Sequence, residues 1–271
     1  MSTYSAPLLT LGIDLASASD KTAFALVEWT RPTSNSRHPR DYKGQLVQLC
    51  LQGSDHDLLQ FHPSEQCLIG LDAPLGWPAS FVQYISTPLK DLKSFARPAQ
   101  VWGPEFRDQF RYRQTDYYTR SVLGRWPLSV STDYLSLVGL RARGLLRLWD
   151  ISNITGEDFV YEVYPAVALK RWGLVHRGYK GSAENKVKIR QEMLIQLSHL
   201  FSIHIPTHFK IQLVQSDHGF DAFICALITL YASLDLCDLP SDDSIQQLSQ
   251  HEGWIYIPHS PPLSSLKSSL P

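Results

Sequence analysis

Leu8-Leu9-Thr10-Leu11-Gly12-Ile13-Asp14 is the stretch of this chain that decides the fold. Leu8 to Ile13 has the length and the apolar character of a buried strand, and Asp14 stands at its carboxyl end. The apolar run from Thr22 to Trp29 follows after a few small and polar residues, which predicts a neighbouring antiparallel strand. Because ligands of open α/β sheets bind at the carboxyl ends of the strands, Asp14 is a candidate site residue. Its alternative role is to hydrogen-bond the backbone amides of the following turn.

A later stretch, Gln66 to Asp72, repeats this design: an apolar strand delivers an aspartate, and Ala73-Pro74 ends the strand. Gln45 to Leu51 predicts a third strand between the two, so the chain opens with an antiparallel meander. If the strands that end in Asp14 and Asp72 pair in parallel, both carboxylates point into one crevice. The alternative is a pair of unrelated turns at strand ends.

Length and composition predict one large α/β domain. The 271 residues, 44% of them hydrophobic, can bury a full core. We expect a single domain over residues 1–258, with an insertion at about 75–150 that begins in a proline-broken segment, and a flexible C-terminal tail over 259–271. Turn-forming residues are frequent over 235–250, and residues 253–258 predict a last strand.

Charge and cysteine usage argue against several classes of protein. A formal net charge of -1 provides no general attraction to nucleic acid or to a membrane, so a polyanion would have to be held by a local basic patch. The four cysteines form no CxxC pair, which indicates reduced thiols and no structural zinc site. No signal peptide is recognisable, and no apolar run approaches the ~18 residues of a membrane span. We therefore expect a soluble, cytoplasmic protein, whose oligomeric state the sequence does not indicate.

Arginine and aromatic residues are mixed over residues 106–147, and this mixture can hold phosphates and stack on bases. Its tightest element is the segment 111–117, in which Arg111, Arg113 and Asp116 are candidate substrate-binding residues. Lys180, in a Tyr-Lys-Gly segment, is a fourth candidate. Arginines on helix faces are as often structural, and Arg113 with Asp116 has the i,i+3 spacing of a helical ion pair.

Further carboxylates occur in the second half of the chain. Glu162 lies inside Phe159 to Pro165, a predicted strand, where an ionised glutamate must be paired or bind a cation unless the strand is a half-exposed edge. Asp217 and Asp221 stand one turn apart at the start of an almost wholly apolar helix. The favourable field at a helix N-terminus explains Asp217. Asp221 leads directly into the core, so its buried charge must be balanced by some other partner.

The order of these elements, two strands that each end in an acid and a late helix that begins with one, resembles the ribonuclease H-like superfamily. More closely, the chain resembles a family of predicted nucleases with a ribonuclease H-like fold, domain of unknown function 429 (DUF429). The resemblance rests on Gly12-Ile13-Asp14, Leu71-Asp72-Ala73-Pro74-Leu75-Gly76, Tyr161-Glu162-Val163-Tyr164-Pro165, Asp217 to Ala222 and Gly253-Trp254-Ile255. It implies an α/β fold with a ribonuclease H-like mixed sheet, antiparallel at first and then parallel, flanked by helices and carrying a helical insertion.

The resemblance also implies an activity. Carboxylates from the first strand, the fourth strand and the final helix would hold two divalent cations, and Mg²⁺ or Mn²⁺ suits aspartate oxygens. Two such ions about 4 Å apart would activate a water and stabilise the leaving oxygen during phosphodiester hydrolysis of nucleic acid or a nucleotide-like phosphoester. The implied catalytic ligands are Asp14, Asp72 and Asp221, with Asp217 and Glu162 as accessory metal ligands. The pair His218-Gly219 departs from the family pattern and favours Asp221 over Asp217.

Two other classes of function stay open. Actin-like sugar kinases and ATPases share the sheet and the Gly-Ile-Asp strand, but they need glycine-rich phosphate loops, and this sequence contains none. The second alternative is a catalytically silent binding module that holds a nucleotide or a partner in the crevice. The distances between the carboxyl groups of Asp14, Asp72 and Asp221 decide whether a shared cation site exists at all.

Overall fold

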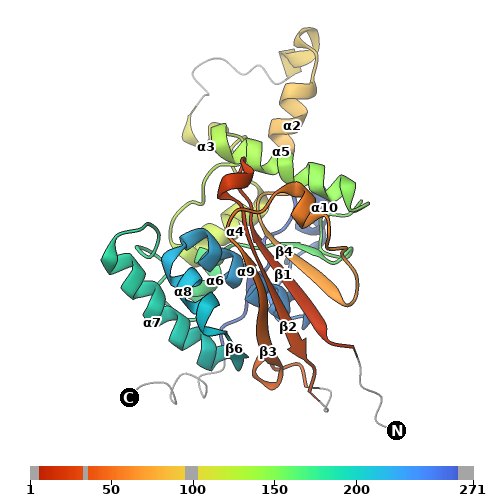
Figure 1. Ribbon diagram of the computed structural model, residues 1–271. Helices are drawn as coiled ribbons and strands as arrows, with labels where there is room; N and C mark the ends of the chain where they lie inside the picture. Colours follow the sequence, from red (N-terminus) through yellow and green to blue (C-terminus); the bar gives the residue numbers. More distant parts are fainter. Residues whose placement is uncertain (1–5, 33–35, 95–102, 262–271) are drawn as a thin grey trace.

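The computed structural model describes residues 6–32, 36–94 and 103–261 and contains a central mixed sheet (Figure 1). The strands of this sheet are β1 (Leu8–Asp14), β2 (Ala23–Thr30), β3 (Lys43–Cys50), β4 (Cys67–Asp72), β5 (Val160–Glu162) and β6 (Ile203–His204). Their order across the sheet is β5-β4-β1-β2-β3-β6. A small second sheet pairs β7 (Cys237–Asp238) with β8 (Ile257–Pro258).

The pairing of the strands confirms the opening meander and the mixed α/β class. β1, β2 and β3 are antiparallel neighbours, whereas β4 lies parallel to β1, and β5 lies parallel to β4. Asp14 and Asp72 are register partners across β1 and β4. The two acids therefore emerge side by side at the same edge of the sheet, as the repeated strand design predicts.

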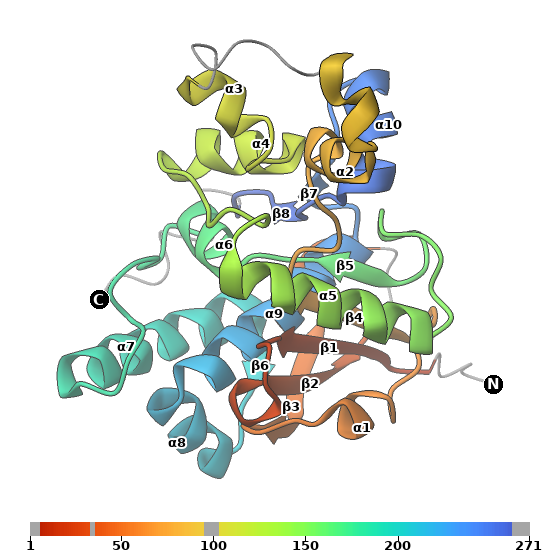
Figure 2. The ribbon, with the colours of Figure 1, turned by 90° about the horizontal axis from the view of Figure 1, so that it is seen from above.

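Helices cover the sheet and its two edges. They are α1 (Asp55–Leu58), α2 (Ala79–Ser86), α3 (Pro104–Asp108), α4 (Gln114–Leu123), α5 (Asp133–Leu148), α6 (Pro165–Arg171), α7 (Glu184–Phe201), α8 (Thr207–Gln215), α9 (Asp217–Ser233) and α10 (Asp243–Glu252). Short 3-10 helices are η1 (Ser19–Lys21), η2 (Pro39–Asp41) and η3 (Leu89–Ser94). Figure 2 shows α2, α3, α4 and α10 grouped beyond the β5 edge, away from α7 and α8 beside β6. Among the described residues, no helix is both long and apolar enough to cross a lipid bilayer.

Two apolar cores lie on the two faces of the sheet. On one face, α9 packs on the strands together with α6 and α7, and nearly all of its side chains are buried. On the other face, α5 buries the row Val138, Ala142 and Leu145 against Leu11 and Ile13 of β1. The predicted insertion at 75–150 thus ends in a helix that belongs to the core of the domain.

Two glycines allow α9 to lie directly on the strands. A Cβ atom added at Gly12 would come within 2.1 Å of the carbonyl oxygen of Ala222, and one at Gly70 within 2.0 Å of Oγ1 of Thr229. Gly12 and Gly70 are register partners on β1 and β4, so together they form a shallow groove for the helix. This close approach brings the N-terminal part of α9 to the carboxyl ends of the two strands.

The structure differs from the sequence prediction mainly in short elements of the second half. The turn-rich segment 235–250 contains most of α10, which begins where Asp242 accepts hydrogen bonds from the amides of Ser244 and Ile245. The predicted last strand is reduced to a bridge at Ile255 and the two residues of β8. Most of the predicted tail, residues 262–271, lies outside the described residues.

Candidate functional site

Three carboxylates meet where β1 and β4 end and α9 begins. Asp14 is the last residue of β1, Asp72 is the last residue of β4, and Asp221 lies in the second turn of α9. One carboxylate oxygen from each lies within 4.8 Å of the other two. Asp221 is buried, whereas Asp14 and Asp72 are half-buried. Asp14 and Asp72 are 58 positions apart in the sequence, and Asp72 and Asp221 are 149 positions apart. A parallel strand pair and one closely packed helix bring them together.

Burial and neighbouring charge disfavour the ionisation of Asp72 and Asp221. Burial raises the pKa of Asp72 well above its usual value, and the neighbouring charge of Asp14 raises it further. Burial also raises the pKa of Asp221, to about 6, although the ammonium of Lys180 opposes the shift. A cluster of carboxylates with raised pKa values is stabilised by a positive charge between them.

Asp221 is held by two neighbouring residues of the loop between α6 and α7. The hydroxyl of Tyr179 donates a hydrogen bond of 2.8 Å to Oδ1 of Asp221. Nζ of Lys180 lies 2.5 Å from Oδ2 in an ion pair, but no hydrogen bond of acceptable geometry reaches this buried oxygen. The Asp221 carboxylate therefore keeps coordinating capacity on the side that faces Lys180. The Lys180 side chain is 59% exposed, so it can leave this position at small cost in burial.

His218 supplies a second counter-charge. Its Nδ1 lies 2.6 Å from Oδ2 of Asp14, and this hydrogen bond raises the pKa of the imidazole although partial burial lowers it. The sequence marked His218 only as a departure from a family pattern. Its position in the first turn of α9, where that helix meets the end of β1, is what places it on Asp14.

A buried arginine holds the loop that carries Tyr179 and Lys180, and the sequence analysis missed it. Arg190 of α7 is fully buried and donates hydrogen bonds to backbone carbonyls at both ends of the site: those of Tyr179, Gly181, Val214 and Gln215. It thereby connects the loop before α7 to the C-terminal end of α8. In the sequence Arg190 stands in a helix of mixed charge, where nothing distinguishes it from a solvated residue.

Asp217 lies near the three carboxylates but has a different environment. The N-cap of α9 is Ser216, whose side chain accepts from the amide of Gly219. Oδ2 of Asp217 accepts a 2.7 Å hydrogen bond from the amide of Gly181. Burial raises the pKa of Asp217, but this hydrogen bond and the nearby His218 outweigh burial and lower it overall. Asp217 therefore fixes the loop before α7 to the start of α9.

Glu162 and two of the predicted substrate-binding residues form a separate buried network. Arg113, only 2% exposed, donates from Nη2 to Oε1 of Glu162 at 2.7 Å and from Nη1 to Oε2 at 2.9 Å. It also donates from Nε and Nη2 to the two oxygens of Asp116. The amide of Leu75 adds a hydrogen bond to Glu162. β5 is an edge strand, yet Glu162 is buried because Arg113 covers it.

This network corrects the roles expected for its members. The Glu162 carboxylate is occupied by Arg113 and does not join the group formed by Asp14, Asp72 and Asp221. Arg113 and Asp116 are enclosed and paired, as the alternative of a helical ion pair predicted, so neither is available to a substrate phosphate.

Arg111, the remaining substrate candidate of this segment, is engaged at the surface. It pairs with Asp108 at 3.2 Å, and its guanidinium lies 4.8 Å from the ring centre of Tyr112.

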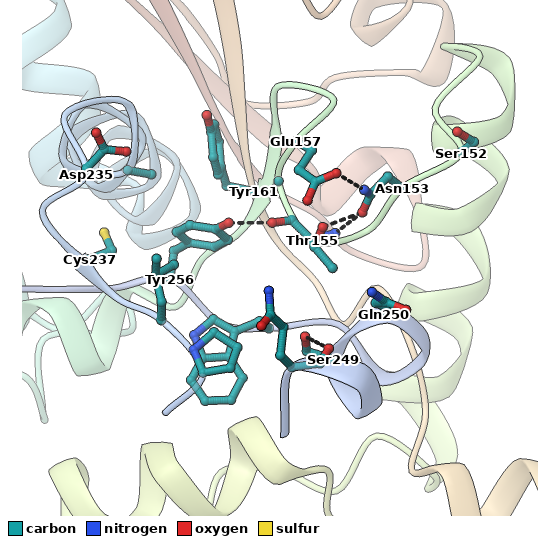
Figure 3. Close-up of a pocket in the computed structure, with 16 residues that line it drawn as sticks. Ser152, Asn153, Thr155, Glu157, Tyr161, Asp235, Cys237, Ser249, Gln250 and Tyr256 are labelled. Atoms are coloured by element: carbon teal, nitrogen blue, oxygen red, sulfur yellow. Dashed lines mark hydrogen bonds between the residues drawn. The ribbon is translucent and has the colours of Figure 1, made fainter. Parts of the chain in front are cut away.

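A large cavity is lined by none of the three carboxylates. It has a volume of about 730 Å³ and is lined by the loop 152–157, by Tyr161 and Tyr256, and by α10 (Figure 3). Its charged lining residues are the acids Glu157 and Asp235, with no lysine, arginine or histidine. These two acids belong to no group of three potential metal ligands among the described residues, so this cavity offers no cation site comparable to that of the three carboxylates.

Comparison with known proteins identifies the family. A family model described as "Protein of unknown function (DUF429)" matches residues 12–245, which include all three clustered aspartates. No curated protein and no solved structure shows significant similarity to the chain. The match covers well over half of the sequence and agrees with the resemblance carried by the Gly-Ile-Asp and Asp-Ala-Pro-Leu-Gly segments. The chain belongs to the DUF429 family.

Proposed function

We propose that the protein is a metal-dependent phosphodiesterase that cleaves nucleic acid, with Asp14, Asp72 and Asp221 as its catalytic carboxylates. The single observation that carries the proposal is the approach of these three oxygens to within 4.8 Å of one another from β1, β4 and α9. The same elements supply the ligands in the arrangement that a resemblance to ribonuclease H-like nucleases implies.

The chemistry of the residues suits a hard divalent cation. The cluster offers only carboxylate oxygens, the ligands that Mg²⁺ and Mn²⁺ prefer. The buried Oδ2 atom of Asp221 is approached only by Nζ of Lys180, at 2.5 Å, so a cation that displaces this ammonium gains a coordination position there. The raised pKa values of Asp72 and Asp221 are the expected property of acids that need a cation to stay ionised together.

The residues around the cluster have separate tasks in this proposal. One or two bound cations would supply the activation of water and the stabilisation of the leaving oxygen. Asp14, Asp72 and Asp221 would hold the cations, while Asp217 keeps the loop before α7 fixed to the start of α9 through the amide of Gly181. Lys180, released from Asp221, is positioned to hold a non-bridging oxygen of the phosphate. Tyr179 keeps the Asp221 carboxylate oriented through its hydrogen bond to Oδ1.

A second candidate function is favoured by a specific observation. Lys180 and His218 already lie against Asp221 and Asp14, so side chains of the protein itself partly neutralise the cluster. A site balanced in this way suits a metal-free module that binds a nucleotide or a partner in the crevice. Direct titration of the protein with Mn²⁺ separates the two candidates, because the binding module takes up no cation at the cluster.

The decisive experiment measures metal-dependent hydrolysis of DNA, of RNA and of bis(p-nitrophenyl) phosphate, with Mg²⁺ or Mn²⁺ and with EDTA. We expect cleavage of at least one substrate by the wild-type protein. Asp14→Asn should reduce the rate by at least about 100-fold, since it removes a ligand charge while keeping the side-chain shape.

Asp243→Asn, an exposed acid in α10, is the matched control and should keep the wild-type rate. If no diester is hydrolysed with either metal, or if Asp14→Asn retains full activity, the proposal is wrong. ATP turnover with intact nucleic acid would instead support a phosphotransferase.

A further inference from the structure

Two stretches next to the carboxylates contain basic residues and no acids. Between Glu162 and Glu184 the chain has Lys170, Arg171, His176, Arg177 and Lys180 without one aspartate or glutamate. Between Asp116 and Asp133 it has Arg120 and Arg125, again without an acid. In a protein with a formal net charge of -1, these are local concentrations of positive charge.

The fold brings the two stretches together. Leu123 at the end of α4 and Val167 of α6 belong to one apolar cluster, and Tyr164 at the start of α6 packs against it. Gly124, which ends α4 with a left-handed backbone, faces Lys170: a Cβ atom placed there would lie 4.0 Å from Nζ of Lys170. The turn that carries Arg125 therefore lies beside the end of α6.

The same surface continues to the carboxylates. The loop after α6 carries Arg177 and then Lys180, whose Nζ lies 2.5 Å from Asp221. Burial and the charge of Asp72 raise the pKa of Tyr164, whereas the charges of Arg125 and Lys180 lower it, so all three charges act on this ring at the start of α6. The pKa of His176 is lowered by burial and by the charges of Arg177, Lys170 and Arg125.

The cations of this surface are available to a ligand. Arg125 and Arg177 are exposed, and Lys170 is half-buried. No ion pair joins any of the three to an acid within the part of the chain that the structure describes. Exposed arginines without carboxylate partners, set beside a site for one phosphodiester, suit the neighbouring phosphates of the same strand.

We infer that Arg125, Lys170 and Arg177 form a binding surface for phosphates that flank the scissile diester, so that the substrate is a strand of several nucleotides. This inference rests on the proposed function and narrows its substrate class. A mononucleotide or an isolated phosphodiester reaches only the carboxylates and Lys180, whereas an oligonucleotide also engages the basic surface.

The test measures binding of labelled 12-nucleotide DNA and RNA single strands by fluorescence anisotropy between 50 and 300 mM salt. Each phosphate contact to a single strand contributes about 0.7 to the slope of log Kd against log salt concentration. The double variant Arg125→Ala/Arg177→Ala should lower this slope by about 1.4. Arg107→Ala/Arg147→Ala, which removes two exposed arginines from α3 and α5, is the matched control and should keep the wild-type slope. The two arms show whether the surface accepts DNA, RNA or both.

A parallel assay separates this inference from the proposed function. Metal-dependent hydrolysis of bis(p-nitrophenyl) phosphate, which has one phosphate, should be the same in Arg125→Ala/Arg177→Ala and in the wild type. If this hydrolysis occurs but the salt slope is unchanged by the variant, the phosphate surface is refuted and the phosphodiesterase stands. If the slope falls as expected but no diester is cleaved, the surface stands and the catalytic proposal is wrong.

Discussion

Gly12→Ala should separate α9 from the sheet and disassemble the carboxylate cluster. The added methyl group would lie 2.1 Å from the carbonyl oxygen of Ala222 and 2.2 Å from the amide nitrogen of Ala226, both backbone atoms that cannot rotate away. Real Cβ contacts essentially never fall below 3.0 Å, so the helix must move by at least 3.0 minus 2.1, or 0.9 Å. Asp221 directly precedes Ala222 and moves with it. Overpacking of this kind costs about 1–3 kcal/mol, and we expect the upper part of that range because backbone must shift.

Two measurements test this expectation. Urea denaturation should give a free energy of unfolding lower by about 2–3 kcal/mol, and titration with Mn²⁺ should show at least 10-fold weaker binding at the carboxylates. The matched control is Gly144→Ala, at an exposed position of α5 where an added Cβ meets no atom within 4 Å. The control should gain about 0.5–1 kcal/mol from helix propensity. A Gly12→Ala protein as stable as the wild type, with unchanged Mn²⁺ affinity, would refute the role given to this glycine.

Two further predictions concern the buried network and the alkaline limit of stability. Arg113→Met should destabilise the protein by about 3–5 kcal/mol in urea denaturation, because it leaves Asp116 and Glu162 buried without a cation. Glu162→Gln should destabilise the protein less, since Arg113 keeps Asp116 as its partner. Equal losses of stability in the two variants would contradict this account. Burial raises the pKa of Tyr161 from 10 to about 12, so the stability from its neutral form is complete below pH 10 and is lost as pH rises towards 12, by at most about 2.7 kcal/mol. Tyr161→Phe should remove that part of the decline when unfolding is measured between pH 9 and 12, and an unchanged decline would show that Tyr161 does not cause it.

The central strands and the three clustered acids could be predicted because their signals are local. β1 and β4 are continuous apolar runs, and each ends in an aspartate that the strand geometry must deliver to one edge. Asp221 stood out because a charge leads directly into an apolar helix. Each of these segments singles out its acid by its own physical properties, whereas the expectation that the three acids meet came from the resemblance to ribonuclease H-like proteins.

The roles of Arg113 and Glu162 could not be predicted in the same way. They are 49 positions apart and meet only because α4 docks against the end of β5 and the segment around Glu252, whose carbonyl also accepts from Arg113. From the sequence, an arginine beside tyrosines looks like a ligand for phosphates, and a glutamate inside a strand looks like a ligand for a cation. Each of the two side chains neutralises the buried charge of the other, and this pairing is recognised only when the structure shows that both are buried.

The same reasoning explains why the surroundings of the carboxylates were harder to predict than the carboxylates themselves. An acid that the strand or helix geometry drives into a site leaves a trace in the sequence, because it interrupts an apolar pattern. A basic side chain that reaches the site from a loop leaves no such trace in the sequence. Lys180 reaches Asp221 because Arg190 fixes the carbonyls of Tyr179 and Gly181, and neither Lys180 nor Arg190 interrupts an apolar pattern. The basic side of such a site therefore has to be sought in the structure, in loops whose backbone a buried side chain holds in place.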